Sequence, residues 1–271
     1  TEAGVDVEFG VASLKCHAKI IHVTREEQGE SVEYAYISSG NLNEKTARIY
    51  TDFGLFTKRS ELTGEIDKVF DFIINPYKHF DFQHLQVSPN NSRHPLYELI
   101  DAEIMAAQEG RRAEIFLKVN NLVDEGLAKK LYEASQAGVK IRLIVRGMCN
   151  VRPGLEGISD NISAISVVDR FLEHSRVSLF YAGGKRTMYI TSADWMTRNI
   201  DHRVEVGCPI LDKSLKKVIK DQLDIQWRDN TKGRIIDANQ LNMYAPRGNR
   251  KKIRSQIEIY NYLRQLERTR D

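Results

Sequence analysis

Two short motifs in the sequence combine an imidazole with a nearby cation. They are His17-x-Lys19 and His174-x-Arg176, and β-rich sequence follows each. On a strand, side chains at i and i+2 point to the same face, so each motif presents both groups together. Lys and Arg neutralise phosphate oxygens, and His acts as a nucleophile or as an acid/base near neutral pH. Each motif therefore predicts a surface suited to phosphate chemistry.

The two motifs belong to an internal repeat. Tyr36–Asn41 aligns with Tyr189–Asp194, and the triplets Asp52-Phe-Gly and Glu205-Val-Gly follow eleven residues later in both copies. An apolar helix pattern follows each triplet. Three matches in register are less probable by chance than one. The repeat indicates two related halves.

Related halves that pack like-to-like bring equivalent residues together about a pseudo-twofold axis. The predicted product is a cleft that holds two His, one Lys and one Arg. Polar residues of the repeated segments are candidates for orienting the imidazoles through the second ring nitrogen. These supporting residues are Asn41, Asn43, Asp52, Asp194 and Glu205.

Structural roles are the alternative for every one of these residues. A single His on a strand is more often structural than catalytic, and we interpret His22, His79, His84, His94 and His202 in this way. The repeat favours a chemical role for His17 and His174.

Two further residues have both a functional and a structural interpretation. Arg146 ends a predicted strand just before a Gly, where α/β folds commonly place ligand contacts, but it could form only a surface salt bridge. Tyr50 could simply pack through its ring. The residues alone leave both alternatives open.

Strands and one helix are predicted for the first part of the chain. Residues 19–25 and 32–38 are rich in β-formers, and a Gly within 27–30 suits a hairpin turn. An amphipathic helix follows, with Ser60 placed to cap it, and it ends before Pro76. Residues 75–95 lack a clear period and are interpreted as a connector.

Helices alternate with strands in the second part. We predict helices at 96–108, 126–137 and 211–227, strands at 115–119 and 139–146, further strands within 163–210, and a last helix near 253–266. This alternation is typical of parallel crossovers and an α/β layer. We place a domain boundary near Phe80, which divides the chain into residues 1–80 and 81–271.

Composition limits the function classes. The 271 residues are 41% hydrophobic and 28% charged, which excludes a disordered or low-complexity protein. The formal net charge of +3 is too small to indicate nucleic-acid binding, so any anion site must be local. Three widely spaced Cys suit a reducing cytosol, and no apolar run approaches the roughly 20 residues that span a bilayer. Because the sequence starts with neither an initiator Met nor a signal peptide, we expect a piece of a longer protein.

The motifs resemble two related families. The His-x-Lys motif followed by Ser-Ser-Gly-Asn resembles the phospholipase D superfamily, but Thr24 and Tyr181 stand where that family has Asp, and Arg176 replaces Lys. A closer resemblance is to the C-terminal half of class 1 polyphosphate kinases. It rests on Leu14–Lys19, Gly40–Asp52, Val145–Cys149, Gly157–Asn161, Ser192–Asn199 and Pro246–Arg250.

The resemblance implies a fold and a reaction. The fold is α/β, with two phospholipase D-like lobes related by a pseudo-twofold, the first truncated at its amino-terminal side. His17 takes the terminal phosphate of ATP, His174 is the proposed acid/base, and Tyr50 and Arg146 contact the nucleotide or its phosphates. Lys19 and Arg176 supply charge. The reaction is reversible transfer of that phosphate to inorganic polyphosphate.

Further expectations follow from the same resemblance. Mg²⁺ is the cofactor, with ligands upstream of this chain and no metal site within it. ATP, ADP and polyphosphate are the partners, and nucleic acid is not. The full-length enzyme is expected to be cytoplasmic and homo-oligomeric, and the sequence leaves peripheral membrane association open.

Two alternative functions remain on sequence grounds. One is a phospholipase D-like phosphodiesterase that uses the same phosphohistidine. The other is a polyphosphate- or nucleic-acid-binding module, a polyanion-binding protein that retains the cleft without turnover. For either function, the basic segment Arg247–Arg254 has two interpretations, a solvated face or the lining of the exit for a polyanionic chain.

Overall fold

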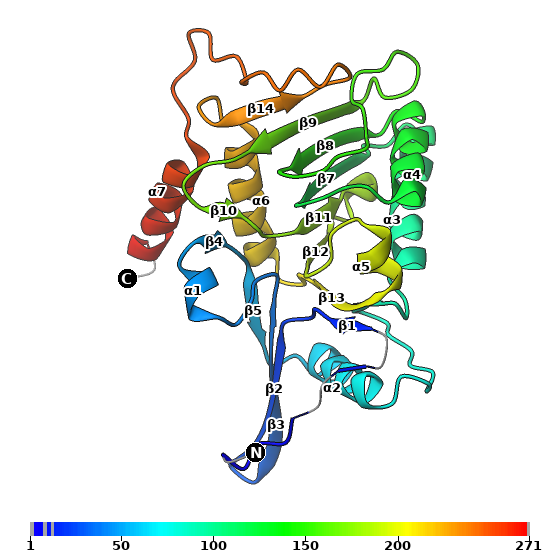
Figure 1. The fold of residues 1–271 in the computed structure, drawn as a ribbon, viewed down its shortest axis with the longest axis vertical. Coiled ribbons are helices and arrows are strands. Elements are labelled where there is room, and N and C mark those ends of the chain that lie inside the picture. Colours follow the sequence, from blue (N-terminus) through cyan, green and yellow to red (C-terminus); the bar gives the residue numbers. More distant parts are fainter. Residues whose placement is uncertain (1–2, 8–9, 12–13, 270–271) are drawn as a thin grey trace.

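The computed structural model describes residues 3–7, 10–11 and 14–269 (Figure 1). A large mixed sheet dominates the molecule, and among the described residues it has nine strands in the order β1-β13-β12-β11-β7-β8-β9-β14, with β6 paired to β13. The strands are β1 (Lys15–Cys16), β6 (Gln86–Ser88), β7 (Glu114–Val119), β8 (Lys140–Val145), β9 (Ile162–Val167), β11 (Val177–Phe180), β12 (Thr187–Thr191), β13 (Arg203–Pro209) and β14 (Gly233–Ile236).

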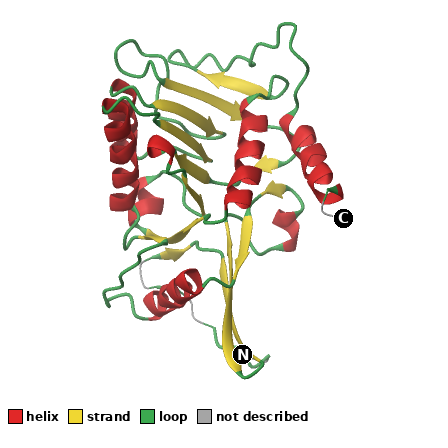
Figure 2. Ribbon diagram, turned by 180° about the vertical axis from the view of Figure 1, so that it is seen from behind, coloured by secondary structure: helices red, strands yellow, loops and turns green. Residues whose placement is uncertain are grey.

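Helices cover both faces of this sheet (Figure 2). α3 (Arg93–Gln108) and α4 (Glu125–Gln136) lie on one face, and α6 (Lys213–Trp227) lies on the other. Side chains alternate along a strand, so in β7 Ile115 packs in the α3–α4 core while Phe116 belongs to the core that α6 covers. β7, β8 and β9 run parallel to one another, as the alternating pattern predicted. The α/β architecture is confirmed.

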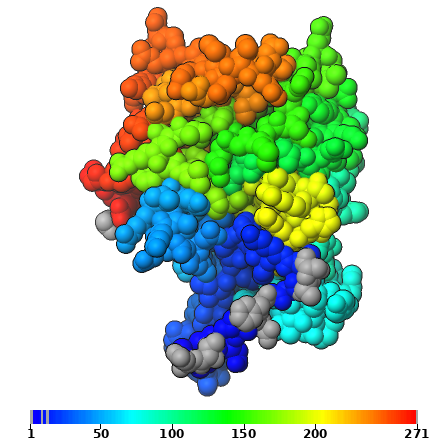
Figure 3. Space-filling view, in the orientation of Figure 1, coloured from blue at the N-terminus to red at the C-terminus, as the bar shows by residue number. Residues whose placement is uncertain are grey.

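A second, smaller sheet carries the first repeat. It contains β2 (Ile20–Glu27), β3 (Glu30–Ser38) and β5 (Gly54–Thr57), with α2 (Ser60–Ile74) packed against it. β2 and β3 form a long hairpin that projects from the body of the molecule (Figures 1 and 3). Its turn uses Gln28 at φ +55° and Gly29 at φ +86°, the left-handed pair that matches the twist of a two-residue hairpin.

Two local predictions were wrong. Ser60 is the first residue of α2 rather than its cap, because the extended residue at the cap position is Arg59, whose side chain makes no capping bond. The segment predicted as a connector contains β6, and α3 begins within it at Arg93. Three residues are too few to show a periodic pattern, so the sequence could not reveal this strand.

Short elements join the two repeats. β4 (Tyr50–Thr51) pairs in parallel with β10 (Leu172–Glu173), and β1 pairs in parallel with β13. The remaining elements are α1 (Glu44–Ala47), α5 (Thr197–Asp201), the 3-10 helix η1 (Ala182–Gly184) and α7 (Ser255–Arg268). One apolar core contains residues of both predicted domains, such as Ile37 and Ile66 with Val204 and Val206. Within the described chain, every helix is too short or too polar to cross a membrane.

Candidate active site

The backbone of the second repeat holds His17. This residue follows β1, and the N–H groups of His17 and Ala18 both donate to the carbonyl of Val204, at 2.8 and 2.9 Å. The imidazole Nδ1 lies 2.8 Å from Oε2 of Glu205, the next residue of β13. His17 is therefore oriented by the neighbouring strand rather than by its own hairpin.

Buried donors hold Glu205 in place. Its side chain is 1% exposed, and it accepts hydrogen bonds from Ser192 Oγ at 2.5 Å and Asn199 Nδ2 at 2.5 Å. A carboxylate so surrounded acts only as an acceptor, which assigns the hydrogen of the His17 ring to Nδ1. The Nε2 lone pair of His17 is thus available for chemistry.

His174 is held in the same manner from the first repeat. Its backbone N–H donates to the carbonyl of Thr51 at 3.2 Å, and its Nδ1 lies 2.8 Å from Oδ1 of Asp52. Burial lowers the pKa of His174, and the cations Arg176 and Arg146 lower it further against the raising effect of Asp52. Neutral imidazole with Nδ1–H is the form that results at neutral pH.

Equivalent serines show that the sequence repeat is a structural repeat. Ser39 Oγ donates to Asp52 at 3.0 Å and accepts from the N–H of Phe53 at 3.0 Å. Ser192 Oγ donates to Glu205 and accepts from the N–H of Val206 at 3.1 Å. The histidine and acid of each pair come from opposite repeats, so the predicted pseudo-twofold is present and its pairs are crossed.

Two buried cations stand beside the imidazoles. Lys19 is 8% exposed, and its Nζ donates to the carbonyl of His17 at 2.5 Å. Burial, together with the positive charge of Arg176, lowers the pKa of Lys19 to about 8, although Glu205 and Asp52 oppose this shift. Arg176 donates from Nε to Asp194 at 3.0 Å, and its Nη1 lies 3.4 Å from Nε2 of His174. Asp194 thus positions the arginine and not an imidazole.

Arg146 and Tyr50 border the same cluster. Arg146 follows β8, and its Nε donates to Asn120 Oδ1 at 2.9 Å and to the carbonyl of Glu173 at 2.6 Å. Both bonds use Nε, so the terminal amino groups remain for a ligand. Burial lowers the pKa of this guanidinium. The Tyr50 ring lies 4.8 Å from the ring of His174, centre to centre.

The two asparagines differ from the acids in their surroundings. Asn41 is exposed and lines, with His17 and Lys19, an open hollow of about 500 Å³. Asn43 is the N-cap of α1, where its side chain accepts from the N–H groups of Lys45 and Thr46. The expectation that Asn43 orients an imidazole is therefore replaced by a capping role.

Several contacts of the site lie outside the predicted set. Ser39 and Ser192 occur in the repeated segments, so the repeat itself carried the signal for them. Asn120 holds Arg146 and Asn199 holds Glu205, and neither has a matching residue in the other repeat that could reveal it. The histidines interpreted as structural lie elsewhere, and His79, His84, His94 and His202 are exposed.

The residues present do not fit a magnesium ion. Among the described residues, no group of three or more His, Cys, Asp or Glu could hold a metal. The carboxylates nearest the imidazoles are already bound: Asp52 to His174, Glu205 to His17 and Asp194 to Arg176.

Comparisons with known proteins identify the family of this chain. Residues 1–79 match the family described as polyphosphate kinase C-terminal domain 1, and residues 85–256 match polyphosphate kinase C-terminal domain 2. The chain is 55% identical over 267 residues to polyphosphate kinase of Escherichia coli strain K12, and 56% identical over 268 residues to that of Vibrio cholerae. These alignments include 98% and 99% of this chain but 39% and 38% of the relatives.

A solved structure shows the same fold. The crystal structure of polyphosphate kinase from Porphyromonas gingivalis aligns with a TM-score of 0.89 and 40% identity, covering 95% of this chain and 40% of that one. The chain therefore spans about two fifths of its relatives' length. On these matches, it belongs to the polyphosphate kinase family and corresponds to the C-terminal part of those enzymes.

Proposed function

We propose that this chain carries the phosphoryl-transfer centre of a polyphosphate kinase, which moves the terminal phosphate of ATP through a phosphohistidine to inorganic polyphosphate and back. The crossed pairs His17–Glu205 and His174–Asp52, each with a buried cation in contact with its histidine, are the observation that supports it. Two oriented imidazoles beside cations suit a phosphoryl group better than any neutral substrate.

His17 is the nucleophile in this proposal. Its Nε2 lone pair forms a bond to the γ-phosphorus of ATP, while the bond from that phosphorus to the β–γ bridging oxygen breaks and its electron pair leaves with ADP. The ring becomes cationic as the bond forms. Glu205, fixed by Ser192 and Asn199, stabilises that charge at Nδ1–H without having to move.

The cations act on the transferred group. Phosphoryl transfer has a loose transition state with charge spread over the equatorial oxygens, so alignment and positive charge provide most of the catalysis. Lys19 and Arg176 flank the imidazoles, and the free amino groups of Arg146 point to a nucleotide or polyphosphate oxygen in this proposal. Tyr50, beside His174, is the proposed nucleotide contact.

His174 accepts and donates a proton in this proposal. Its lowered pKa keeps Nε2 unprotonated at neutral pH, which suits acceptance of a proton from the terminal hydroxyl of a polyphosphate chain. The chain end then attacks the phosphohistidine, and the N–P bond electrons return to His17 Nε2. Reversal uses the same proton to neutralise the departing chain end.

The location, the cofactor and the oligomeric state of the full-length protein are also proposed. A cytoplasmic location agrees with the free state of Cys16, Cys149 and Cys208. Dependence on Mg²⁺, with ligands outside this chain, and homo-oligomerisation stay predictions from the family resemblance.

Labelling tests the nucleophile directly. In the full-length protein, ATP labelled at the γ-phosphate should leave acid-labile, base-stable label on the wild type and on His94→Ala, a surface control. His17→Ala should carry none, and label that persists on this variant would overturn the assignment. Hydrolysis of a phosphodiester by the wild type without nucleotide would favour the phosphodiesterase instead.

A further inference from the structure

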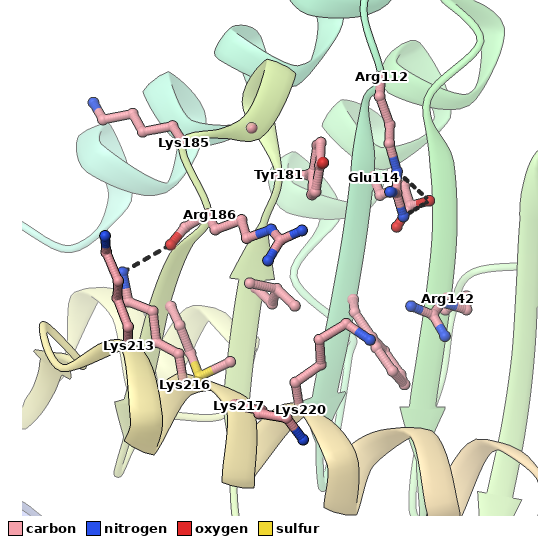
Figure 4. Close-up of a pocket in the computed structure, with 14 residues that line it drawn as sticks. Arg112, Glu114, Arg142, Tyr181, Lys185, Arg186, Lys213, Lys216, Lys217 and Lys220 are labelled. Carbon is pink, nitrogen blue, oxygen red and sulfur yellow. Dashed lines mark hydrogen bonds and ion pairs between the residues drawn. The ribbon is translucent and has the colours of Figure 1, made fainter.

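A second cavity lies on the α6 side of the main sheet (Figure 4). It has a volume of about 460 Å³, within the range of small-molecule sites. Phe116 of β7, Leu179 of β11 and Met188 of β12 provide apolar lining, and basic side chains surround them. The proposed catalytic cluster, which comprises His17, Lys19, His174 and Arg176 with Tyr50 and Arg146 beside them, contributes none of its residues to this cavity.

The cavity is at the opposite end of the strands from the catalytic cluster. Glu114, which lines it, begins β7, whereas Asn120, which holds Arg146, follows the end of that strand. A strand rises about 3.3 Å per residue, so the two places are about 20 Å apart along β7. A molecule in this cavity would not take part in the transfer at His17.

Part of the positive charge around the cavity is neutralised. Arg112 donates to Glu114, Lys217 pairs with Asp221, and Arg142 and Lys220 both pair with Asp224. Arg112 and Lys217 contribute little net field because each has its own carboxylate in contact, whereas Arg142 and Lys220 share the single carboxylate of Asp224.

Four other cations lack such partners. Among the described residues, Lys185, Arg186, Lys213 and Lys216 form no ion pair with a carboxylate. Figure 4 shows them at one end of the cavity, where Lys216 Nζ donates to the carbonyl of Arg186 at 2.9 Å. Burial and the charge of Lys213 lower the pKa of Lys216. Mutually repelling cations at one end of a cavity indicate an anionic ligand.

Two local features of the backbone lie at this end. Lys213 and Lys216 lie in the first turn of α6, where the helix dipole favours anions over cations and where the N-cap carboxylate of Asp212 accepts from the N–H groups of Ser214 and Leu215. Arg186 has φ +53°, a left-handed conformation that is costly for a residue with a side chain. A bound anion would offset the unfavourable interaction of Lys213 and Lys216 with the helix dipole.

The part of the cavity next to these cations suits a flat ring. Tyr181 stands there, with the guanidinium of Arg112 at 4.3 Å from its ring centre and that of Arg186, which extends from the cationic end, at 5.3 Å. Arg142 lies 3.9 Å from the ring centre of Phe116. Aromatic and guanidinium planes stack with nucleobases, and the apolar lining below them does not attract bare phosphate.

From this arrangement we propose that the cavity is a second nucleotide site, which binds a nucleoside di- or triphosphate. The base lies on the Tyr181 and Phe116 side, and the phosphates contact Lys185, Arg186, Lys213 and Lys216. This site is separate from the catalytic nucleotide site and does not depend on the mechanism proposed for His17.

Methionine methyl groups can report on the two sites separately. The sequence has five Met, of which Met188 lines the cavity and Met148 follows Arg146 closely in the catalytic region. In the 271-residue chain with ¹³C-methyl Met, ATP should shift the Met188 signal saturably. His17→Ala/Arg146→Ala should keep that shift, because the cavity is independent of the catalytic cluster. Loss of the shift in this variant would assign it to the catalytic site and overturn the proposal.

Matched variants test the phosphate contacts. Lys213→Ala/Lys216→Ala should raise the ATP concentration that gives half of the Met188 shift at least tenfold. The control Lys78→Ala/Lys129→Ala, which removes the same charge elsewhere, should leave that concentration unchanged. Equal effects of the two pairs would show nonspecific attraction by net charge and overturn the site. A wild-type Met188 signal that does not respond to ATP would do the same.

Ligand fragments test the base. Tripolyphosphate and adenosine should each need at least a tenfold higher concentration than ATP to shift Met188. Tripolyphosphate acting in the same concentration range as ATP would show that the base contributes nothing, and the nucleoside assignment would then be wrong.

Discussion

His17 and Glu205 are 188 residues apart in sequence, and the imidazole Nδ1 of one lies 2.8 Å from the carboxylate of the other. His174 and Asp52 repeat the contact at the same distance with the repeats exchanged. Each imidazole therefore depends on a carboxylate that its own repeat does not supply. Activity is that of the full-length protein for each variant below, since the chain spans about two fifths of its relatives' length.

Glu205→Gln should slow phosphorylation of His17 by about 10²–10⁴-fold. A neutral amide cannot stabilise the imidazolium, and it can present its amino group to Nδ1, which favours the wrong tautomer. Rapid-quench measurement of the first turnover with γ-labelled ATP checks this expectation. Asp52→Asn is the matched variant, and it should affect transfer to polyphosphate more than the labelling step. A rate within threefold of wild type for Glu205→Gln would contradict the role of this pair.

Gly40→Ala should reduce turnover by about 10²-fold, because a Cβ there would lie 2.2 Å from Oδ2 of Asp52 and would displace the residue that orients His174. The control is Gly64→Ala in α2, where a Cβ has nothing within 4 Å. This control should keep wild-type turnover and raise the free energy of unfolding by about 0.5–1 kcal/mol. Unchanged turnover in Gly40→Ala would mean that the position of Asp52 is unimportant.

The pH profile of kcat/KM should have a descending limb near pH 8. Lys19 has a pKa of about 8, below its usual value, so its charge is present below that pH and is lost as the pH rises through it. Binding of an anionic substrate favours the charged form and moves the limb upward in kcat relative to kcat/KM. Lys19→Arg, whose charge persists, should remove the limb from the kcat/KM profile. A limb that stays at the same pH in this variant would assign it to another group.

Lys118→Met should lower the free energy of unfolding by about 3–5 kcal/mol, because it leaves the carboxylate of Glu173 buried without its cation. Lys118 Nζ lies 2.6 Å from Glu173, both residues are 3% exposed, and Gln226 and Gln256 donate to the same carboxylate. Lys118→Met/Glu173→Gln should recover part of the loss. Urea denaturation measures both, and equal stability of the single and double variants would contradict the argument.

The repeat predicts which residues belong to the proposed catalytic cluster, but not how they pair. His17, His174 and their cations could be placed together because three matched segments imply a twofold. Which acid contacts which imidazole depends on β1·β13 and β4·β10, and the strands β1, β4 and β10 have only two residues each. Such strands are too short for an alternating pattern, so no sequence signal identifies their partners.

The long elements were predictable for the opposite reason. The helix that begins at Ser60 has an apolar face over four turns, and only its cap was assigned incorrectly.

The cavity beside α6 was not recognised in the sequence. Its unpaired cations come from two places, residues 185–186 and the start of α6, and they meet only because β12 and α6 are neighbours in the fold.

Each imidazole contacts the carboxylate of the other repeat, and this exchange bears on how such a protein could arise. Within the part of the chain that the structure describes, the carboxylate bonded to each of the two imidazoles comes from the other repeat, so an ancestor with one copy of the unit would have needed two chains to build this pair. Joining the copies in one chain allows them to diverge, as Asp52 and Glu205, or Lys19 and Arg176, have done. Identical subunits would have two identical imidazoles, whereas the fused chain can assign covalent chemistry to one and proton transfer to the other.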